Sequence, residues 1–461
     1  MDKTSASLDD VQGPARAADD EQHLAVQRNT QRTQEARSAR DEAAAAGTLA
    51  WDPFDPAWMA DPYSVYARLR ETSPVHRSPL GFWVFTRHAD CLSILRDRGV
   101  SSDTRNRDKL LTTGRDSDTA TPVDPSRPRS TLDEALDELI PFIFRDPPDH
   151  TRLRGLVQKA FTPRVIQGLQ PRIEQICAEL LDAALERREI DLVADYAYPL
   201  PVRIISEILG VPPEDRTRFQ QWSDALTHGL DPEFLLSPEA ITQRTAGMLS
   251  FVQYFADLIS QRRANPGDDL ITRLIQAEEH GDVLSPMELI ATCLLLLVAG
   301  HETTVSLISG GALALIEHPD QLARFRDDPG VAASGIEEML RFVSPVQLTT
   351  RIATQTMRFG DFVVEEGDAC MLLIGSANRD PDVFTAPDTF DVGRADNPHL
   401  GFGLGIHHCL GAPLARLESR IALSALVRRV GRWERTTHEL AYKDNIALRG
   451  LASLPVDLTP A

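Results

Sequence analysis

A long apolar segment with helix signals at both ends constrains the fold of this chain more than any other feature. Ser285, Pro286 and Glu288 supply a hydroxyl cap, a proline at the first helical position and a carboxylate three residues after the cap. The helix should end near His318, ahead of a proline, which gives roughly 32 residues and about 48 Å. Residues 289–300 are apolar on nearly every face, so we expect a helix buried through the centre of the fold.

The rest of the chain predicts a mainly α fold with a small β region. Further helices are expected at 63–72, 165–187, 200–209, 214–227, 240–263 and 269–278. Short β-prone stretches at 82–85, 355–364 and 446–458 predict a small sheet beside the helices. Because no internal repeat or dividing linker interrupts this pattern, we expect residues 49–461 to form a single domain.

Composition limits the compartment and the partners. Residues 1–48 lack clusters of large apolar side chains and are expected to be a disordered tail, and the polar stretch after Ser101 is expected to be a long loop. The chain carries 68 acidic and 48 basic residues, a net charge of -20, which disfavours nucleic acid as a partner. Five scattered cysteines fit a reducing cytoplasm, and we expect no secretory signal or membrane anchor.

The strongest chemical signal surrounds Cys409. Residues 402–411 read Phe-Gly-Leu-Gly-Ile-His-His-Cys-Leu-Gly, and apolar residues at helical spacing follow. A lone cysteine is most often a buried structural residue. Here the helix start that follows should favour a thiolate, and six fixed residue types in ten positions arise by chance on the order of once in a million.

The segment resembles the cysteine-ligand loop Phe-Gly-x-Gly-x-His-x-Cys-x-Gly of the cytochrome P-450 family, and the resemblance extends from about Trp51 to Leu458. It implies a triangular helical domain with a long central helix, and haem b (iron protoporphyrin IX) as cofactor. Cys409 would be the metal ligand, with loop N–H groups tuning its sulfur. The resemblance assigns cofactor binding to Cys409, His150, Arg154, Arg351, His407, Ala299, Gly300, Phe402, Gly403 and Gly411.

Three groups of these residues resemble haem propionate contacts of the family. His150 and Arg154 are four residues apart, so one helix face offers two donors to a carboxylate. Arg351 and His407 match further propionate contacts. Either the stretch with His150 and Arg154 or the one with Arg351 would, by itself, more often be a solvated surface.

A second motif, Ala299-Gly300-His301-Glu302-Thr303-Thr304, lies in the central helix. A carboxylate deep in a helix is costly unless something uses it, although a solvated kink is the alternative. The motif resembles the small-Gly-x-acid-Thr oxygen site of the family. The resemblance implies that Thr303 hydrogen-bonds dioxygen and that Glu302 relays protons to it.

Glu338 and Arg341 are three residues apart and match the Glu-x-x-Arg motif of the family, and Arg394 matches the arginine that completes that network. We assign these three residues to structure rather than chemistry. By the same resemblance Leu295, Val298, Gln347 and Ala452 should lie near an apolar small-molecule substrate.

The resulting hypothesis is an O2-dependent monooxygenase that hydroxylates or epoxidises a secondary metabolite such as a polyketide, a macrolide or a terpenoid. Electrons should come from a ferredoxin and its NAD(P)H-dependent reductase, docking near Lys159, Arg416 and Arg420. A peroxide-dependent peroxygenase and a non-catalytic haem-binding protein are the alternatives. Glu302 and Thr303 argue against both, because neither needs a proton relay.

Overall fold

The computed structural model describes residues 50–53, 55–78, 81–103, 139–215, 238–277 and 283–460, with 218, 222, 226, 231 and 236 in addition. Three predictions fall mostly or wholly outside these residues. They are the disordered tail at 1–48, the polar loop after Ser101 and the helix at 214–227.

Helices make up most of the described chain. They are α2 (Pro56–Ala60), α3 (Pro62–Thr72), α4 (His88–Arg96), α7 (Asp149–Ala160), α8 (Pro163–Gly168), α9 (Gln170–Arg187), α10 (Pro199–Ile208), α12 (Pro238–Ala264), α13 (Leu270–Gln276), α14 (Pro286–Glu317), α15 (Pro319–Asp327), α16 (Ala332–Phe342), α17 (Ile374–Ala377) and α18 (Ala412–Arg429). Short helical turns are η1 (Phe142–Phe144), η2 (Val193–Ala197), η3 (Pro213–Asp215), η6 (Pro329–Val331) and η7 (Gly405–His407). The expected mainly α fold is confirmed.

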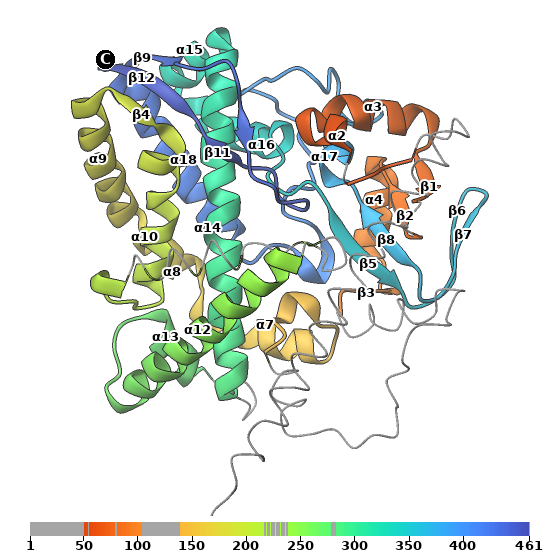
Figure 1. The fold of residues 1–461 in the computed structure, drawn as a ribbon, viewed down its shortest axis with the longest axis horizontal. Coiled ribbons are helices and arrows are strands. Elements are labelled where there is room, and N and C mark those ends of the chain that lie inside the picture. Colours follow the sequence, from red (N-terminus) through yellow and green to blue (C-terminus); the bar gives the residue numbers. More distant parts are fainter. Residues whose placement is uncertain are drawn as a thin grey trace, which may run out of the picture.

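The long central helix is confirmed as α14. The Ser285 side chain accepts from the Glu288 N–H and the Glu288 carboxylate accepts from the Ser285 N–H, which completes the capping box. α14 runs through the middle of the molecule, between a helical side with α9, α10 and α18 and a side with the largest sheet (Figure 1). It is long and apolar enough to cross a bilayer, but 78% of its apolar window is buried inside the protein. Its apolar surface therefore belongs to the core.

The predicted helix at 165–187 is two helices. α8 ends at Gly168 and α9 begins at Gln170, with a proline in its first turn. The Pro171 ring would clash with the carbonyl four residues earlier in a continuous helix, so the chain breaks just ahead of it.

Within the described residues, strands form one larger sheet and three small ones. The larger sheet has the order β1-β2-β8-β5-β3, and the small ones are β4-β12-β9, β10-β11 and β6-β7. Their bounds are β1 (Val75–Arg77), β2 (Trp83–Phe85), β3 (Val100–Ser101), β4 (Glu189–Asp191), β5 (Thr349–Ala353), β6 (Met357–Phe359), β7 (Phe362–Val364), β8 (Ala369–Leu372), β9 (Val430–Arg435), β10 (Ala441–Tyr442), β11 (Leu451–Ser453) and β12 (Pro455–Pro460). The predicted β regions thus contain strands.

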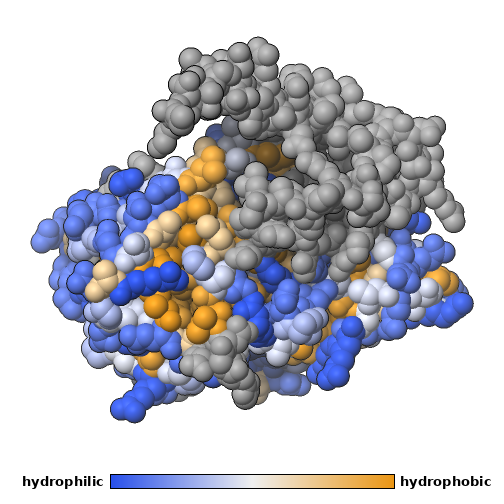
Figure 2. All heavy atoms as spheres, turned by 90° about the horizontal axis from the view of Figure 1, so that it is seen from below, coloured by the Kyte–Doolittle hydropathy of each residue, from blue (hydrophilic) through white to orange (hydrophobic). Residues whose placement is uncertain are grey.

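The main hydrophobic core surrounds α14 and joins it to α9, α10 and α18. A second cluster lies between α4 and the larger sheet, and a third contains Trp51, Trp58 and Tyr66 beside α3. Seen from below, apolar side chains gather in the middle of the surface and hydrophilic ones surround them (Figure 2).

Candidate active site around Cys409

Cys409 lies in a tight loop three residues ahead of α18. Its N–H donates to the Phe402 carbonyl at 2.9 Å, and this bond closes the loop. Gly403 and Gly405 have φ values of 63° and 69°, a region that favours glycine. A Cβ at Gly405 would also lie 2.6 Å from the Leu95 carbonyl oxygen. The glycines of the motif are therefore needed for the backbone path that presents Cys409.

The exposure of Cys409 sets it apart from the other cysteines. Cys91, Cys177, Cys293 and Cys370 are buried, whereas Cys409 is exposed. Burial raises the pKa of the four others, so these thiols remain protonated in the core. The structure accordingly leaves one cysteine able to meet a ligand.

The environment of the Cys409 sulfur contains opposing influences. Desolvation raises the pKa of its thiol, and the N–H groups of Gly411 and Ala412 and the guanidinium groups of Arg154 and Arg416 lower it. Desolvation prevails, so the expectation that the loop by itself favours a thiolate is wrong. A bound cation would reverse this balance, because a coordinating thiol loses its proton outright.

The four predicted propionate contacts come from three separate segments, and the structure brings them together as one group. We call His150, Arg154, Arg351 and His407 the basic cluster. The imidazole rings of His150 and His407 lie 4.3 Å apart between centroids. Both ring nitrogens of His150 and Nδ1 of His407 are buried without a hydrogen-bond partner. The Arg154 Nη2 donates to the His408 carbonyl at 2.6 Å, which ties α7 to the cysteine loop.

Positive charge in the basic cluster is only partly offset by the protein, because Asp146 acts on Arg351 and His150 without pairing with Arg351 directly. Arg351 is 9% exposed and donates only to Thr349 Oγ1 and the Thr350 carbonyl, and it makes no ion pair within the described part of the chain. Burial lowers its pKa to about 10. Burial, together with the neighbouring Arg351, His150 and Arg154, lowers the pKa of His407 to about 3. Such a group is stabilised by an anion among its members.

These residues fit haem b. Unpartnered imidazole nitrogens and a buried guanidinium suit the two carboxylates of the cofactor, and an exposed cysteine beside them suits its iron. The fit rests on the donor atoms present and on their burial.

Thr303 and Ala299 are one helical turn apart on α14 and are only partly buried, unlike the neighbouring Glu302 and Thr304. The Thr303 Oγ1 donates to the Ala299 carbonyl at 2.9 Å. Gly300 faces the other way, since a Cβ there would meet Ile205 of α10 at 3.6 Å. The motif thus turns Thr303 and Ala299 to accessible space, whereas Gly300 lies against Ile205 of α10; its contact with the cofactor stays a prediction.

Glu302 is buried and bound by a partner that the sequence did not reveal. Its side chain is 1% exposed, and Lys443 Nζ donates to Oε1 at 2.5 Å. His301 Nε2 lies 3.5 Å from Oε2, which is too long for a strong hydrogen bond, and Oε2 has no hydrogen-bond partner. Burial opposes ionisation, but His301 and Lys443 outweigh it and lower the pKa of Glu302 to about 2. Glu302 is thus an ionised carboxylate at neutral pH.

The carboxylate network of Glu338, Arg341 and Arg394 forms as expected. Arg341 donates to both Glu338 oxygens at 2.8 Å, and Arg394 Nε donates to Oε2 at 3.0 Å. Glu338 and Arg341 are fully buried. Arg341 also donates to three carbonyls of the segment 378–389, so the network connects α16 to the chain that leads into the cysteine loop.

The predicted substrate residues differ in burial and in the elements that carry them. Leu295 and Val298 are buried on α14, and Ala452 is exposed on β11. Gln347 lies in the core, where its Oε1 accepts from Tyr66 and its Nε2 donates to the Ser344 carbonyl. The amide of Gln347 is thus engaged within the core, and its place near the substrate stays a prediction.

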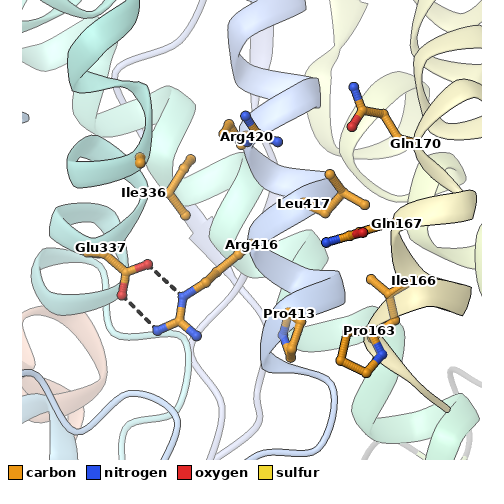
Figure 3. A pocket seen from close by; sticks show the side chains of 11 residues that line it. Pro163, Ile166, Gln167, Gln170, Ile336, Glu337, Pro413, Arg416, Leu417 and Arg420 are labelled. Atoms are coloured by element: carbon orange, nitrogen blue, oxygen red, sulfur yellow. Dashed lines mark hydrogen bonds and ion pairs between the residues drawn. The ribbon is translucent and has the colours of Figure 1, made fainter.

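A cavity of about 520 Å³ lies between α8, α16 and α18. Arg416 and Arg420 line it. Arg416 donates two hydrogen bonds to the Glu337 carboxylate, from Nε at 2.7 Å and from Nη2 at 2.8 Å (Figure 3). Arg416, one of the three cations predicted to attract the electron donor, is therefore already paired with a carboxylate. Lys159 is exposed on α7 but does not line this cavity.

Sequence reasoning missed Lys443, His399 and Glu337. Lys443 is 141 residues from Glu302, and Glu337 is 79 residues from Arg416. No local spacing signals such contacts. His301 lies inside the quoted motif, but its contact with Glu302 emerges only from the geometry of α14.

Known proteins resemble this chain over most of its length. The family model described as "Cytochrome P450" matches residues 126–328 and 331–436. The curated "Cytochrome P450 107B1" of Saccharopolyspora erythraea is 43% identical over 411 residues, covering 87% of this chain and 96% of that protein. The "6-deoxyerythronolide B hydroxylase" of the same species is 37% identical over 418 residues, covering 88% and 97%.

Solved structures agree with the sequence relatives. The bacillaene polyketide synthase cytochrome PksS of Bacillus subtilis has a TM-score of 0.78 and 37% identity, and the match covers 89% of this chain and all of that one. The fold, the cysteine loop and these relatives together place the chain in the cytochrome P-450 family of monooxygenases that bind haem b.

Proposed function

We propose that this chain inserts one oxygen atom from O2 into an apolar small organic substrate, by hydroxylation or epoxidation, in the biosynthesis of a secondary metabolite. The observation that carries the proposal is the basic cluster beside an exposed cysteine. The relatives named for polyketide synthesis and for 6-deoxyerythronolide B hydroxylation support a polyketide or a macrolide as the substrate, and a terpenoid of similar size is the third candidate.

In this proposal Cys409 is the thiolate ligand to iron, and the basic cluster binds the two carboxylates of the cofactor. Phe402, Gly403 and Gly411 form the loop that positions the sulfur and directs N–H groups toward it. When bound, haem supplies dioxygen activation and one-electron redox chemistry. The protein contributes the geometry and the electrostatic field in which that chemistry takes place.

Thr303 and Glu302 handle protons. The Thr303 hydroxyl donates to the Ala299 carbonyl, and its lone pairs remain able to accept a hydrogen bond from water or substrate. Rotation of the hydroxyl would redirect its proton into the accessible space beside Ala299. Glu302 is ionised, so it can accept a proton on Oε2 and deliver it toward Thr303 through water.

Leu295 and Val298 offer apolar surface on α14 near this motif, and Ala452 offers a small exposed side chain on β11. α14 and β11 also pack against each other. An apolar lining with few polar groups suits a substrate held mainly by burial, with water excluded from the reacting centre.

The electron donor in this proposal is a ferredoxin with an NAD(P)H-dependent reductase, in the cytoplasm. The cavity wall formed by Arg416 and Arg420 lies on α18, the helix that follows Cys409, so a donor there would approach the cysteine side. Arg420 is exposed and supplies positive charge for an acidic protein.

A spectroscopic and kinetic experiment tests the proposal. The purified protein is reduced under carbon monoxide, and turnover with O2 and ferredoxin is compared with turnover with peroxide. We expect the red-shifted Soret band typical of the thiolate-ligated ferrous carbonyl and faster turnover with O2. Absence of protoporphyrin, or an unchanged spectrum after Cys409→Ala, contradicts the ligand assignment. Faster turnover with peroxide would identify a peroxygenase, and no turnover with either would identify a haem binder.

Thr303→Ala tests the proton path. Loss of the hydroxyl should uncouple electron consumption from product formation, because protons then arrive by a less controlled route. General acid–base groups typically raise the rate of the step they serve by about 100-fold to 10,000-fold. The measurement is product formed per NAD(P)H consumed. Thr292→Ala is the matched control, since Thr292 makes the same bond to the carbonyl four residues earlier on α14. Equal coupling in both variants would remove Thr303 from the path.

A further inference from the structure

Glu337 on α16 binds two groups that flank the cysteine loop. Its Oε1 accepts from Arg416 Nε at 2.7 Å, and its Oε2 accepts from Arg416 Nη2 at 2.8 Å. His399 Nε2 lies 3.0 Å from the same Oε2. Because His399 Nδ1 accepts from the Gly401 N–H, its Nε2 carries the proton and donates to Glu337.

Both partners of Glu337 contact Phe402. The Arg416 guanidinium lies over the Phe402 ring at 4.5 Å, and the His399 ring lies 6.1 Å from it. The Phe402 carbonyl in turn accepts from the Cys409 N–H. A continuous series of contacts thus leads from Glu337 through Arg416 and Phe402 to the cysteine.

The charge of Arg416 acts at the same place. Arg416 lies about one turn into α18, the helix that starts three residues after Cys409, so its positive charge favours an anion at that end of the helix. Glu337 is the carboxylate that offsets this charge. The pair is half-exposed, with 40% of the Arg416 side chain and 30% of the Glu337 side chain accessible. Figure 3 shows Glu337 and Arg416 side by side in the lining of the cavity.

We propose that Glu337 and Arg416 are positioning residues that set the reduction potential of the haem, by fixing Phe402 and by limiting the positive field at Cys409. The inference rests on the proposed role of Cys409 as iron ligand. Reduction adds an electron, so a more positive surrounding field favours the reduced state. Removing the Glu337 charge should raise the potential, and removing the Arg416 charge should lower it.

The test is a spectroelectrochemical titration of the haem-loaded protein carrying Glu337→Gln, Arg416→Gln or both. We expect Glu337→Gln to favour reduction about threefold, which is about 28 mV at about 59 mV for each tenfold change of a one-electron couple. Arg416→Gln should disfavour reduction by a similar factor. The double variant should return to within about twofold of wild type, because its net charge is unchanged.

Glu207→Gln is the matched control. Arg172 chelates Glu207 at 2.8 Å and 2.7 Å, with side chains 35% and 25% exposed, so the pair has nearly the same geometry and exposure away from the loop. Its potential should equal that of wild type. Equal potentials for Glu337→Gln and Glu207→Gln would overturn the inference, and so would shifts of the same sign in Glu337→Gln and Arg416→Gln.

Arg416→Gln and one further variant, Glu337→Asp, keep the test decisive if Glu337→Gln does not fold. Arg416→Gln alone must lower the potential, and an unchanged value rejects the inference. Glu337→Asp keeps the charge with a shorter side chain, so its potential should stay near that of wild type. Loss of haem from the wild-type protein would instead reject the proposed role of Cys409, which separates the two failures.

Discussion

The carboxylate network and the basic cluster both hold polar side chains away from water, but they are completed in different ways. Glu338 lies between Arg341 and Arg394, and each charge has partners inside the protein. In the basic cluster Arg351 has no ion pair among the described residues, and His150 has two unpartnered ring nitrogens. A network whose charges pair with one another stabilises the fold, whereas buried cations without an ion-pair partner mark the place of an anionic ligand.

The largest expected effect concerns the carboxylate network. Glu338→Gln leaves the buried guanidinium of Arg341 and the partly buried one of Arg394 without their counter-charge, so the free energy of unfolding should fall by about 3–5 kcal/mol. Urea denaturation of the protein measures this loss. Glu207→Gln removes a half-exposed partner and should cost about 0–1 kcal/mol. Similar losses in the two variants would mean that the Glu338 network is not needed for the fold.

Lys443→Met extends the comparison to Glu302, the buried carboxylate of the candidate site. Loss of the ammonium should lower the free energy of unfolding by about 1–3 kcal/mol at neutral pH. The folded-state pKa of Glu302 is about 2, below its ordinary value of 4.5. The stability that this pair contributes is therefore present above pH 4.5 and is lost as pH falls toward 2.

The advantage of wild type over Lys443→Met should accordingly be smaller at pH 4 than at pH 8, measured by urea denaturation at each pH. Arg435→Met is the control, because Arg435 pairs with the exposed Glu317 at 3.0 Å. Its effect should be small and nearly independent of pH over this range. A difference for Lys443→Met that does not change with pH would show that Glu302 does not depend on Lys443 for its ionisation.

Arg351→Gln tests the basic cluster directly. Without the guanidinium the haem carboxylates lose a charge-assisted donor, so haem affinity should fall by about 1.5–3 kcal/mol, roughly tenfold to 150-fold. Haem transfer to an apo-myoglobin acceptor measures the loss. Stability of the haem-free protein should change little or rise, because an unpaired buried charge is removed. Arg379→Gln, which breaks a pair with Asp388, should lower stability and leave haem affinity unchanged.

The smallest effect is expected at the surface. Turnover with an acidic ferredoxin should weaken as salt rises through the range where screening lengths shrink from about 30 Å to about 8 Å. Steady-state rates at increasing salt measure it, with Arg420→Gln reducing the slope. Rates that stay flat from low to high ionic strength would exclude electrostatic docking on the α18 side.

Local sequence patterns predicted much of the fold and part of the site. The capping residues and continuous apolar run of α14 were sufficient because helix ends and burial depend on residues a few positions apart. The glycines around Cys409 predicted a tight loop, because the backbone path of a loop also depends on neighbouring residues. The split between α8 and α9 was missed, although the proline that causes it was visible.

The amino-acid sequence by itself determined the central helix, the cysteine loop and the residues of the basic cluster. The signals for each of them lie in residues that are close along the chain or in a motif of the family. Only the tertiary structure decided that Lys443 neutralises Glu302, that Glu337 holds Arg416, and that Gln347 serves the core. These contacts join segments far apart in the chain, and electrostatic energy depends on distance in space rather than on separation along the sequence.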